Sequence, residues 1–303
     1  MRALLIVNPK ATATTARVRD VLARALASDL KLDVAETERR GHAIELAAEA
    51  AADSTIELVV ALGGDGTVNE VVNGLAGAPL PLAVVPGGST NVFARALGLS
   101  RSPVEATSEI LDALRAGRTR TINLGRANDR LFTFCAGLGI DAEVVRSVEK
   151  HRRKGKPASP GLYVRTALRH FYTGTNRRTP AITLSRRGAD VETGLYNAIV
   201  ANGSPWTYLG GRPVNPCPGA DFDGHLDVIL MRSLRTTSTL RVVRQMLTSR
   251  DRIRSRRATC LHDVAEFTLT ADRPLAAQVD GDYIGEIASM HCKSVPDALT
   301  VVV

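Results

Sequence analysis

The chain has 303 residues, 44% of them hydrophobic and 23% charged, which suits two modest globular domains, each with a core of its own. No run approaches the roughly 18 to 20 apolar residues of a membrane-spanning helix. The four cysteines lie far apart without a CxxC pair, which argues against a zinc site or a disulfide framework and favours a reducing cytoplasm.

The net charge of +8 is unevenly distributed. Residues 150–187 contain many Lys and Arg and no Asp or Glu, and a second basic stretch covers 232–257. Such segments attract phosphate-rich partners, so nucleic acid, an anionic membrane surface and a merely solubilising face all remain open. Aromatic residues make up only 4% of the chain, so stacking platforms for nucleic acid are scarce, and the membrane is favoured over nucleic acid.

The first 120 residues alternate between strand and helix patterns. Strands are expected at 3–7, 32–36, 58–62 and 82–85, and helices at 15–30, 43–52, 67–75, from 91 onward and at 103–116. Short apolar strands interleaved with helices predict a parallel sheet covered on both faces. Ligands of such sheets bind beyond the carboxyl ends of the strands.

The most informative segment is the glycine-rich turn after the strand at 58–62. Gly63, Gly64 and Gly66 allow a tight bend and a close approach of the backbone to a ligand. The N–H groups that begin the next helix favour an anion, yet Asp65 places a carboxylate among them. A carboxylate repels phosphate unless a cation or a proton transfer is involved. The pattern therefore favours phosphoryl chemistry over a plain strand-to-helix turn.

Two further turns follow strands of the same expected sheet. Asn8-Pro9, with Lys10 behind it, ends the first strand and by itself is best interpreted as a simple turn. Gly87-Gly88-Ser89-Thr90 follows the strand at 82–85, and its hydroxyl groups suit either a helix cap or a phosphate. Glycine-rich loops at neighbouring strand ends predict a shared phosphate site. The sequences GxxxxGK[ST] and GxGxxG are absent, which excludes a P-loop and argues against a classical dinucleotide site.

The pattern of expected elements changes near residues 118–120. The pieces after this boundary predict a β-sandwich or barrel, interrupted by helices at 162–170 and 239–248 and by a loop at 150–160. The expected strands are 121–124, 131–135, 181–184, 196–201, 226–231, 266–270, 276–279 and 300–303.

Two acidic turns stand out in this half. The segment 220–227 holds three carboxylates near Gly224, and a site for a hard cation and an Asp-Gly β-turn explain it equally well. Asp280-Gly281-Asp282 is either a hairpin turn, which the spacing favours, or a pair of carboxylates at a cleft.

At these residues the chain resembles the diacylglycerol kinase catalytic family, which includes bacterial soluble lipid kinases and sphingosine kinases. The resemblance spans nearly the whole chain and is carried by Asn8-Pro9, the runs 63–75 and 86–99, Asp223-Gly224 and residues 280–282. It implies an α/β N-terminal domain of the 6-phosphofructokinase/NAD-kinase type, with a parallel sheet covered by helices, and a β-sandwich C-terminal domain. The expected nucleotide-binding domain covers 1–120 with the last strand at about 290–303, and the β-rich lipid substrate domain covers 121–289.

The resemblance also assigns roles to residues. It implies ATP and Mg²⁺ as cofactors, Asp282 as the proton acceptor and Asp65 as the partner of Mg²⁺ at the phosphates. Ala220, Asp223 and His225 match a peripheral magnesium site in which backbone carbonyls can serve. The residues expected at ATP are Asn8, Pro9, Lys10, Ala11, Thr12, Thr37, Gly63, Gly64, Asp65, Gly66, Thr67, Val68, Asn69, Glu70, Gly88 and Ser89.

Three positions depart from the pattern of bacterial members. Ser89 stands where Thr is more frequent, Val92 where Asp is, and Asp282 where Glu is. A Ser keeps the hydroxyl, the loss of Asp at Val92 removes a polar contact, and Asp282 is one methylene shorter than Glu.

The expected function is ATP-dependent phosphorylation of a primary lipid hydroxyl, with diacylglycerol as the first candidate, by a cytoplasmic protein at the inner, anionic membrane surface. A sphingoid-base kinase, an NAD kinase and a non-catalytic nucleotide-dependent regulator or nucleic-acid-binding protein remain alternatives. No nucleic-acid partner is expected, and a homodimer stays open.

Overall fold

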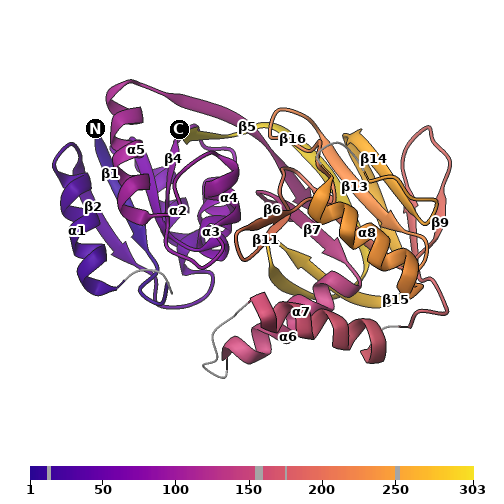
Figure 1. Ribbon diagram of the computed structural model, residues 1–303. Coiled ribbons are helices and arrows are strands. Elements are labelled where there is room, and N and C mark those ends of the chain that lie inside the picture. The colour runs from indigo at the N-terminus through magenta and orange to yellow at the C-terminus, as the bar shows by residue number, and fades with distance from the viewer. Residues whose placement is uncertain (12–14, 154–159, 175, 250–252) are drawn as a thin grey trace. The chain divides into compact units, whose positions relative to one another are not determined.

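The computed structural model describes residues 1–11, 15–153, 160–174, 176–249 and 253–303 (Figure 1). The chain divides into two compact units, one of residues 1–124 with 296–303 and one of residues 125–295. Within the described residues, no helix has both the length and the apolar content to cross a membrane.

The first unit is built on a parallel sheet. Its strands are β1 (Arg2–Val7), β2 (Lys31–Glu36), β3 (Leu58–Gly63) and β4 (Leu82–Pro86). They lie in the order β2-β1-β3-β4, and the end of β16 (Asp282–Val302) continues the sheet beyond β4. Every residue of β3 and β4 is buried, as expected for strands covered on both faces.

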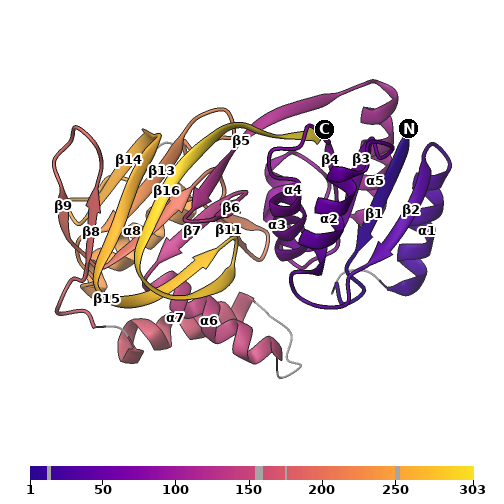
Figure 2. The same cartoon turned by 180° about the vertical axis from the view of Figure 1, so that it is seen from behind.

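Five helices accompany this sheet. They are α1 (Ala16–Ala27), α2 (His42–Ala52), α3 (Asp65–Gly74), α4 (Val92–Ala96) and α5 (Pro103–Arg115). Helix α1 packs against α5 and α2 against α3 (Figures 1 and 2). The chain moves from β1 to β2 in one direction along the sheet and from β2 to β3 in the other. Right-handed crossovers therefore place α1 and α2 on opposite faces.

The ends of these helices follow local capping rules where the sequence supplies a cap. Thr15 caps α1 by accepting the N–H of Val18, and Ser102 caps α5 by accepting the N–H of Glu105, with Pro103 in the first turn. Helix α3 begins at Asp65, two residues before the predicted start, so the glycine turn itself is very short.

The second unit is antiparallel. Its main path runs β14 (Ala258–Val264), β13 (Leu226–Met231), β10 (Asn197–Ala201), β7 (Cys135–Leu138), β15 (Glu266–Val279) and β16. β8 (Ile182–Ser185) pairs with part of β15 on the edge opposite β16, and β9 (Glu192–Leu195) pairs with β8. A separate ribbon consists of β11 (Thr207–Leu209) and β12 (Arg212–Val214). β5 (Thr119–Ala127) crosses the boundary between the units and pairs with β16 and with β6 (Arg130–Phe132).

Side chains of the central strands alternate between two hydrophobic cores, one on each face of the sheet. Val200 and Val228 point into a core that also contains Phe267, while Ile199 and Ile229 point into a second core under a helix. That helix is α8 (Thr236–Thr248); the remaining helices are α6 (Ile140–Arg153), α7 (Pro160–Arg169) and η1, a π-helix (His170–Gly174). Because both faces are covered, every residue of β10 and β13 is buried, and residues 198–201 and 228–231 are all apolar.

The prediction of a loop over 150–160 is wrong at both ends, because helix α6 continues through Arg153 and α7 begins at Pro160. Residues 154–159 lie outside the described part of the chain. Lys150, Arg152 and Arg153 are compatible with this end of α6, since Lys and Arg are good helix formers.

Candidate functional site

Register brings four loops to one edge of the parallel sheet. Val7 stands opposite both Glu36 and Leu62, and Gly63 stands opposite Pro86. Backbone bonds extend the ladder one step further, from Thr37 N to Val7 O (2.8 Å), Asn8 N to Leu62 O (3.0 Å) and Gly87 N to Gly63 O (2.7 Å). The loops that begin at Asn8, Thr37, Gly64 and Gly87 therefore lie side by side.

Two of these loops touch through glycines. A Cβ on Gly88 would lie 2.7 Å from Gly64 Cα, and a Cβ on Gly87 would lie 3.1 Å from Gly63 Cα. A Cβ on Gly63 would lie 2.6 Å from the Cβ of Thr67. Real Cβ atoms essentially never approach within 3.0 Å, and 3.1 Å would be an unusually tight contact, so glycine lets the loops after β3 and β4 close on each other. The result is a surface of bare backbone, which suits a phosphate chain.

Asp65 connects the two loops through a hydrogen bond between the helices that follow them. It is the first residue of α3, whose N-cap, Gly64, has no side chain, and its Oδ1 accepts the N–H of Phe93 in α4 at 3.1 Å. The carboxylate thus interacts favourably with the start of both helices. Asn91, at φ 48°, holds the second loop by accepting from Gly88 N and donating to Gly88 O, both at 2.8 Å.

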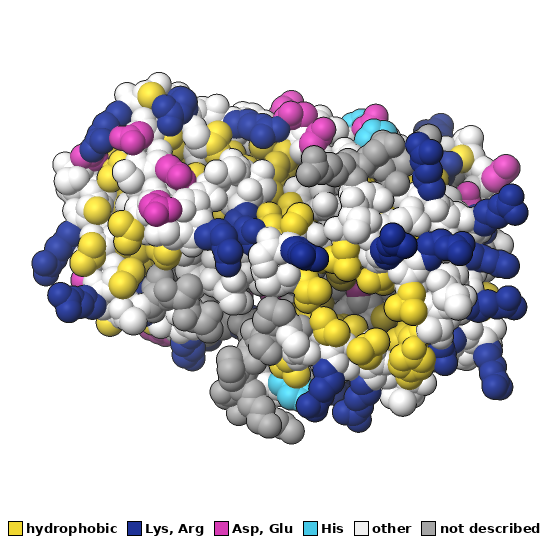
Figure 3. All heavy atoms as spheres, viewed as in Figure 1, with side chains coloured by type: hydrophobic (Ala, Val, Ile, Leu, Met, Phe, Trp, Pro, Cys, Tyr) yellow, Lys and Arg dark blue, Asp and Glu magenta, His cyan; other side chains and the backbone are white. Residues whose placement is uncertain are grey.

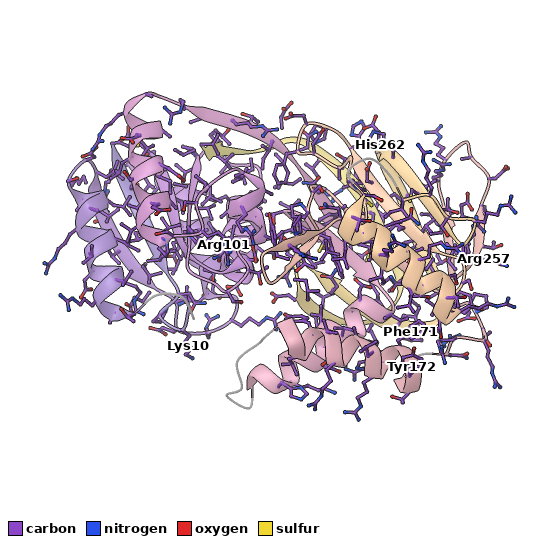
Figure 4. All side chains as sticks on the ribbon, viewed as in Figure 1. Lys10, Arg101, Phe171, Tyr172, Arg257 and His262 are labelled. Atoms are coloured by element: carbon purple, nitrogen blue, oxygen red, sulfur yellow. The ribbon has the colours of Figure 1, made fainter. Side chains whose placement is uncertain are left out.

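The remaining residues expected at the nucleotide fall into two groups. Asn8 donates to Thr67 Oγ1 at 2.9 Å and accepts from Lys10 N at 3.0 Å, so it organises the edge. Lys10 is exposed (Figure 4), and so is Ser89. The side chains of Val68 and Asn69 are buried in α3, which leaves them no surface to offer a ligand. Pro9, Ala11, Thr37 and Gly66 are half-buried on these loops, and Thr12 lies outside the described residues.

Glu70 has a structural partner that the sequence did not reveal. Helix α2 has Gly41 as its N-cap and hence no capping side chain of its own. Glu70, in α3, accepts the N–H of Gly41 at 2.9 Å and that of Ala43 at 3.3 Å. Its carboxylate therefore caps α2 from a neighbouring helix.

In the second unit, Asp280 and Gly281 form the two-residue turn between β15 and β16. Their φ values are 47° and 79°, and Val279 pairs with Asp282, as in a type I′ hairpin. The Asp280 carboxylate is buried and accepts four hydrogen bonds of 2.7–3.0 Å, from the backbone N–H groups of residues 133–135 and the Thr133 hydroxyl. Burial raises the pKa of Asp280, and these N–H donors oppose the rise. Asp280 therefore has a structural role.

Asp282, the predicted proton acceptor, directly follows this turn. Its Oδ2 lies 3.1 Å from Nη2 of Arg130 in β6, and the Asp282 side chain is 18% exposed. Arg130 was not singled out in the sequence analysis, because 152 positions separate it from Asp282 and no local pattern connects the two residues.

Hydrogen bonds from backbone N–H groups to carboxylates hold the acidic turn at 220–227 in place. Asp221 accepts the N–H groups of Asp223 and Gly224 at 3.0 and 2.8 Å, and Asp263 accepts that of His225 at 2.9 Å. Among the residues that the structure describes, no group of three or more His, Cys, Asp or Glu side chains could hold a metal ion. The side chains therefore fit a turn, and a cation bound by Ala220, Asp223 and His225 would depend on backbone carbonyls.

Asp141, in the first turn of α6, is a candidate that the sequence analysis missed. Burial raises its pKa to about 6, while a hydrogen bond from Gln278 to Oδ2 (3.1 Å) counteracts part of the rise. Its Oδ1 is buried and has no hydrogen-bond partner within the described part of the chain. A lone Asp after Gly137-Leu138-Gly139 in an apolar run was the available signal. Buried carboxyl groups with shifted pKa values concentrate at functional sites.

The fold and the loops define a class of protein. It has a parallel α/β unit with glycine-rich loops at the carboxyl ends of its strands, followed in the chain by an antiparallel β unit. Residues 2–127 match the family model for the diacylglycerol kinase catalytic domain, and residues 135–303 match that for the YegS C-terminal NAD kinase beta sandwich-like domain. The chain belongs to the diacylglycerol kinase catalytic family, as the sequence motifs predicted.

Named relatives agree with this assignment. A "Probable lipid kinase YegS-like" of Pseudomonas putida is 32% identical over 76% of this chain and 74% of its own length. The "Diacylglycerol kinase" of Bacillus subtilis is 38% identical, but that alignment covers 48% of each chain. The match thus spans about half the length of that relative.

Solved structures confirm the predicted fold class. A diacylglycerol kinase from Bacillus anthracis str. Sterne superposes with a TM-score of 0.73 at 20% identity, covering 99% of this chain and 96% of that one. An NAD kinase from Archaeoglobus fulgidus in complex with ATP gives a TM-score of 0.55 at 15% identity, covering 100% and 94%. At these identities the likeness concerns the fold alone.

Proposed function

We propose that this protein is an ATP-dependent kinase that phosphorylates the hydroxyl group of a membrane lipid, with diacylglycerol as the first candidate acceptor. The observation that carries the proposal is the glycine contact between the loops after β3 and β4, with Asp65 at the junction. Membership of the diacylglycerol kinase catalytic family supports the same reaction.

In this proposal the first unit binds ATP. The N–H groups of Gly64 and Gly66 interact with the phosphates, and Gly88, Asn8 and Thr37 line the same edge. Asp65 supplies the hard oxygen ligand that Mg²⁺ prefers, and the ion would offset negative charge at the transferred phosphate. Backbone donors and positioning can account for much of the catalysis of phosphoryl transfer.

The second unit would supply the base. The lipid oxygen bonds to the γ-phosphorus, the bond from that phosphorus to ADP breaks, and Asp282 takes the hydroxyl proton. A positioned general base of this kind contributes about 10²- to 10⁴-fold. Arg130 would be a positioning residue, because its guanidinium fixes one oxygen of Asp282. A peripheral Mg²⁺ on the carbonyls of Ala220, Asp223 and His225 remains part of the proposal.

The test compares two substitutions at Asp65. Asp65→Asn keeps an oxygen for Phe93 N but loses the charge, so we expect a folded protein whose phosphorylation of diacylglycerol in mixed micelles falls by about 10²-fold or more. Asp65→Ala also loses the hydrogen bond and should lower the melting temperature. Asp129→Asn removes the same charge from an exposed turn and serves as the matched control. Undiminished turnover by the folded Asp65→Asn variant would refute the site.

A second experiment addresses the acceptor. The likeness of the fold to an NAD kinase makes NAD a specific alternative. Diacylglycerol, sphingosine and NAD are offered in parallel with radiolabelled ATP, and the products are separated by thin-layer chromatography. We expect the label in phosphatidic acid; label in NADP or in a sphingoid-base phosphate would replace the proposed acceptor.

A further inference from the structure

Helix α8 presents an apolar stripe to solvent. Val242 and Met246 anchor the helix in the core beneath it. On the neighbouring side, Leu240, Val243 and Leu247 are 58%, 41% and 37% exposed. Their spacing of three and four residues places them in one row along the helix. Single exposed leucines are ordinary, but three in a row form a surface.

Arginines border this stripe on its solvent side. Arg244 and Arg241 follow it around the helix, and beyond them lies an open hollow of about 640 Å³. Among the residues that the structure describes, the lining of the hollow consists of two serines and four arginines: Ser238, Ser255, Arg241, Arg254, Arg256 and Arg257. Figure 3 shows apolar side chains gathered over α8 with Lys and Arg around them, and Figure 4 shows Arg257 beside the far end of the helix.

We propose that this face of α8 docks onto the surface of an anionic lipid bilayer. Leu240, Val243 and Leu247 would enter the boundary between headgroups and acyl chains, while Arg241, Arg244 and the arginines of the hollow contact lipid phosphates. A helix lying in the membrane interface binds through this combination of an apolar face and flanking basic residues. The aliphatic part of each Arg can extend along the apolar surface while the guanidinium reaches the phosphates.

The charge and apolar content of this face favour a lipid bilayer over a second copy of the chain or a nucleic acid. A second copy of the chain would place the same arginines against one another across a two-fold axis, in a protein of net charge +8. Nucleic acid would satisfy the arginines, but it offers nothing to an aliphatic stripe that contains no aromatic side chain for stacking. Anionic lipid satisfies both parts of the face.

The inference extends the proposed function, because a kinase whose acceptor lies in a bilayer must reach that surface. Binding to vesicles can nevertheless be measured without ATP or turnover, so the two proposals fail separately. Asp65→Asn should bind vesicles as the unmodified protein does.

The test is flotation of the full chain with vesicles of phosphatidylglycerol and phosphatidylcholine, compared with phosphatidylcholine alone, at low salt. Removing two charges in Arg241→Gln/Arg244→Gln should weaken binding about 25-fold, since each surface Arg contributes about fivefold. Leu240→Ser/Leu247→Ser should weaken it by at least about tenfold. The controls, Arg17→Gln/Arg24→Gln and Val21→Ser/Val104→Ser, change exposed residues of the first unit and should bind as before.

A reporter places the contact on the helix. The fluorescence of Leu240→Trp should be quenched by lipids brominated on their acyl chains, whereas that of Val104→Trp should not, with Trp206 as the constant background. Equal flotation of the α8 variants and the controls, or equal quenching at both positions, would overturn the proposal. It would also be overturned if the α8 substitutions left flotation unchanged but abolished self-association in light scattering or binding to single-stranded DNA.

Discussion

Two carboxylates separated by a single glycine have different environments. Asp280 is buried under four hydrogen-bond donors, whereas Asp282 is partly exposed and pairs with Arg130. In an unbroken strand, residues two positions apart face the same side, so it is the tight turn that gives these two acidic residues different surroundings. The sequence Asp-Gly-Asp predicted the turn but did not show that its first Asp holds residues 133–135 in place.

This difference predicts opposite effects of two conservative substitutions. In Asp280→Asn an amide NH₂ would face N–H donors, so we expect the free energy of unfolding to fall by about 1–3 kcal/mol. Asp282→Asn should leave stability nearly unchanged but lower kcat by about 10²-fold or more, because the proton acceptor is lost. Urea denaturation and steady-state phosphorylation measure the two quantities. The reverse pattern would exchange the roles of the two residues.

Asp141 predicts a pH dependence of stability. Its pKa is about 6 in the folded state and about 3.9 in an unfolded chain, so between these values the folded protein binds a proton that the unfolded chain releases. The free energy of unfolding therefore falls as pH rises through this window, by about 3 kcal/mol at most. Asp141→Asn carries no charge to bury and should be more stable than the unmodified protein at pH 7.5.

Urea denaturation at pH 4.5 and 7.5 measures this effect. The stability gained by Asp141→Asn should be larger at pH 7.5 than at pH 4.5. A gain that is the same at both pH values would show that the carboxyl group does not titrate within the window.

At the scale of elements, periodicity and turn residues predicted most of the first unit. The four strands and the helix after Ser102 lie where the pattern places them, since each follows local rules. The second unit was harder because its long strands contain breaker residues. β15 runs unbroken from Glu266 to Val279 through Pro274, where the pairing register with β16 shifts, and the sequence analysis divided it in two. Such a strand is held by neighbours that local reasoning cannot see.

The cap of α2 is an interaction between elements, and it predicts the effect of removing Glu70. Glu70→Ala should destabilise the protein by about 1 kcal/mol, because the N–H groups of Gly41 and Ala43 lose their acceptor. Glu70→Gln retains one oxygen and should lose less. Thermal melts order the three proteins. If both variants instead melt normally and bind ATP poorly, Glu70 acts at the nucleotide, as the family resemblance implied.

At the scale of the molecule, the parts of the candidate site were predictable to different degrees. The loops at Gly64 and Gly88 were expected to share a phosphate site, because parallel strands end at one edge. Pairs such as Arg130 with Asp282 and Glu70 with Gly41 depend on contacts between distant segments, which no single motif encodes. The sequence thus predicts where a site lies better than which side chains orient it.

Both ends of the chain belong to the first unit, and the C-terminal strand there predicts a stability effect of its own. The last residues of β16 belong to that unit, where Val301 is fully buried and pairs with Leu82 of β4. Val301→Ala removes buried carbon atoms beside the strand that leads into the loop at Gly87, so we expect the free energy of unfolding to fall by about 2 kcal/mol. Val104→Ala, 56% exposed in the same unit, should change it by about 0.5 kcal/mol or less.

Urea titrations with and without ATP compare the two variants. Because ATP would bind only the folded first unit, it should raise both midpoints; equal stability of the two variants without ATP would show that the C-terminal strand does not contribute to this core.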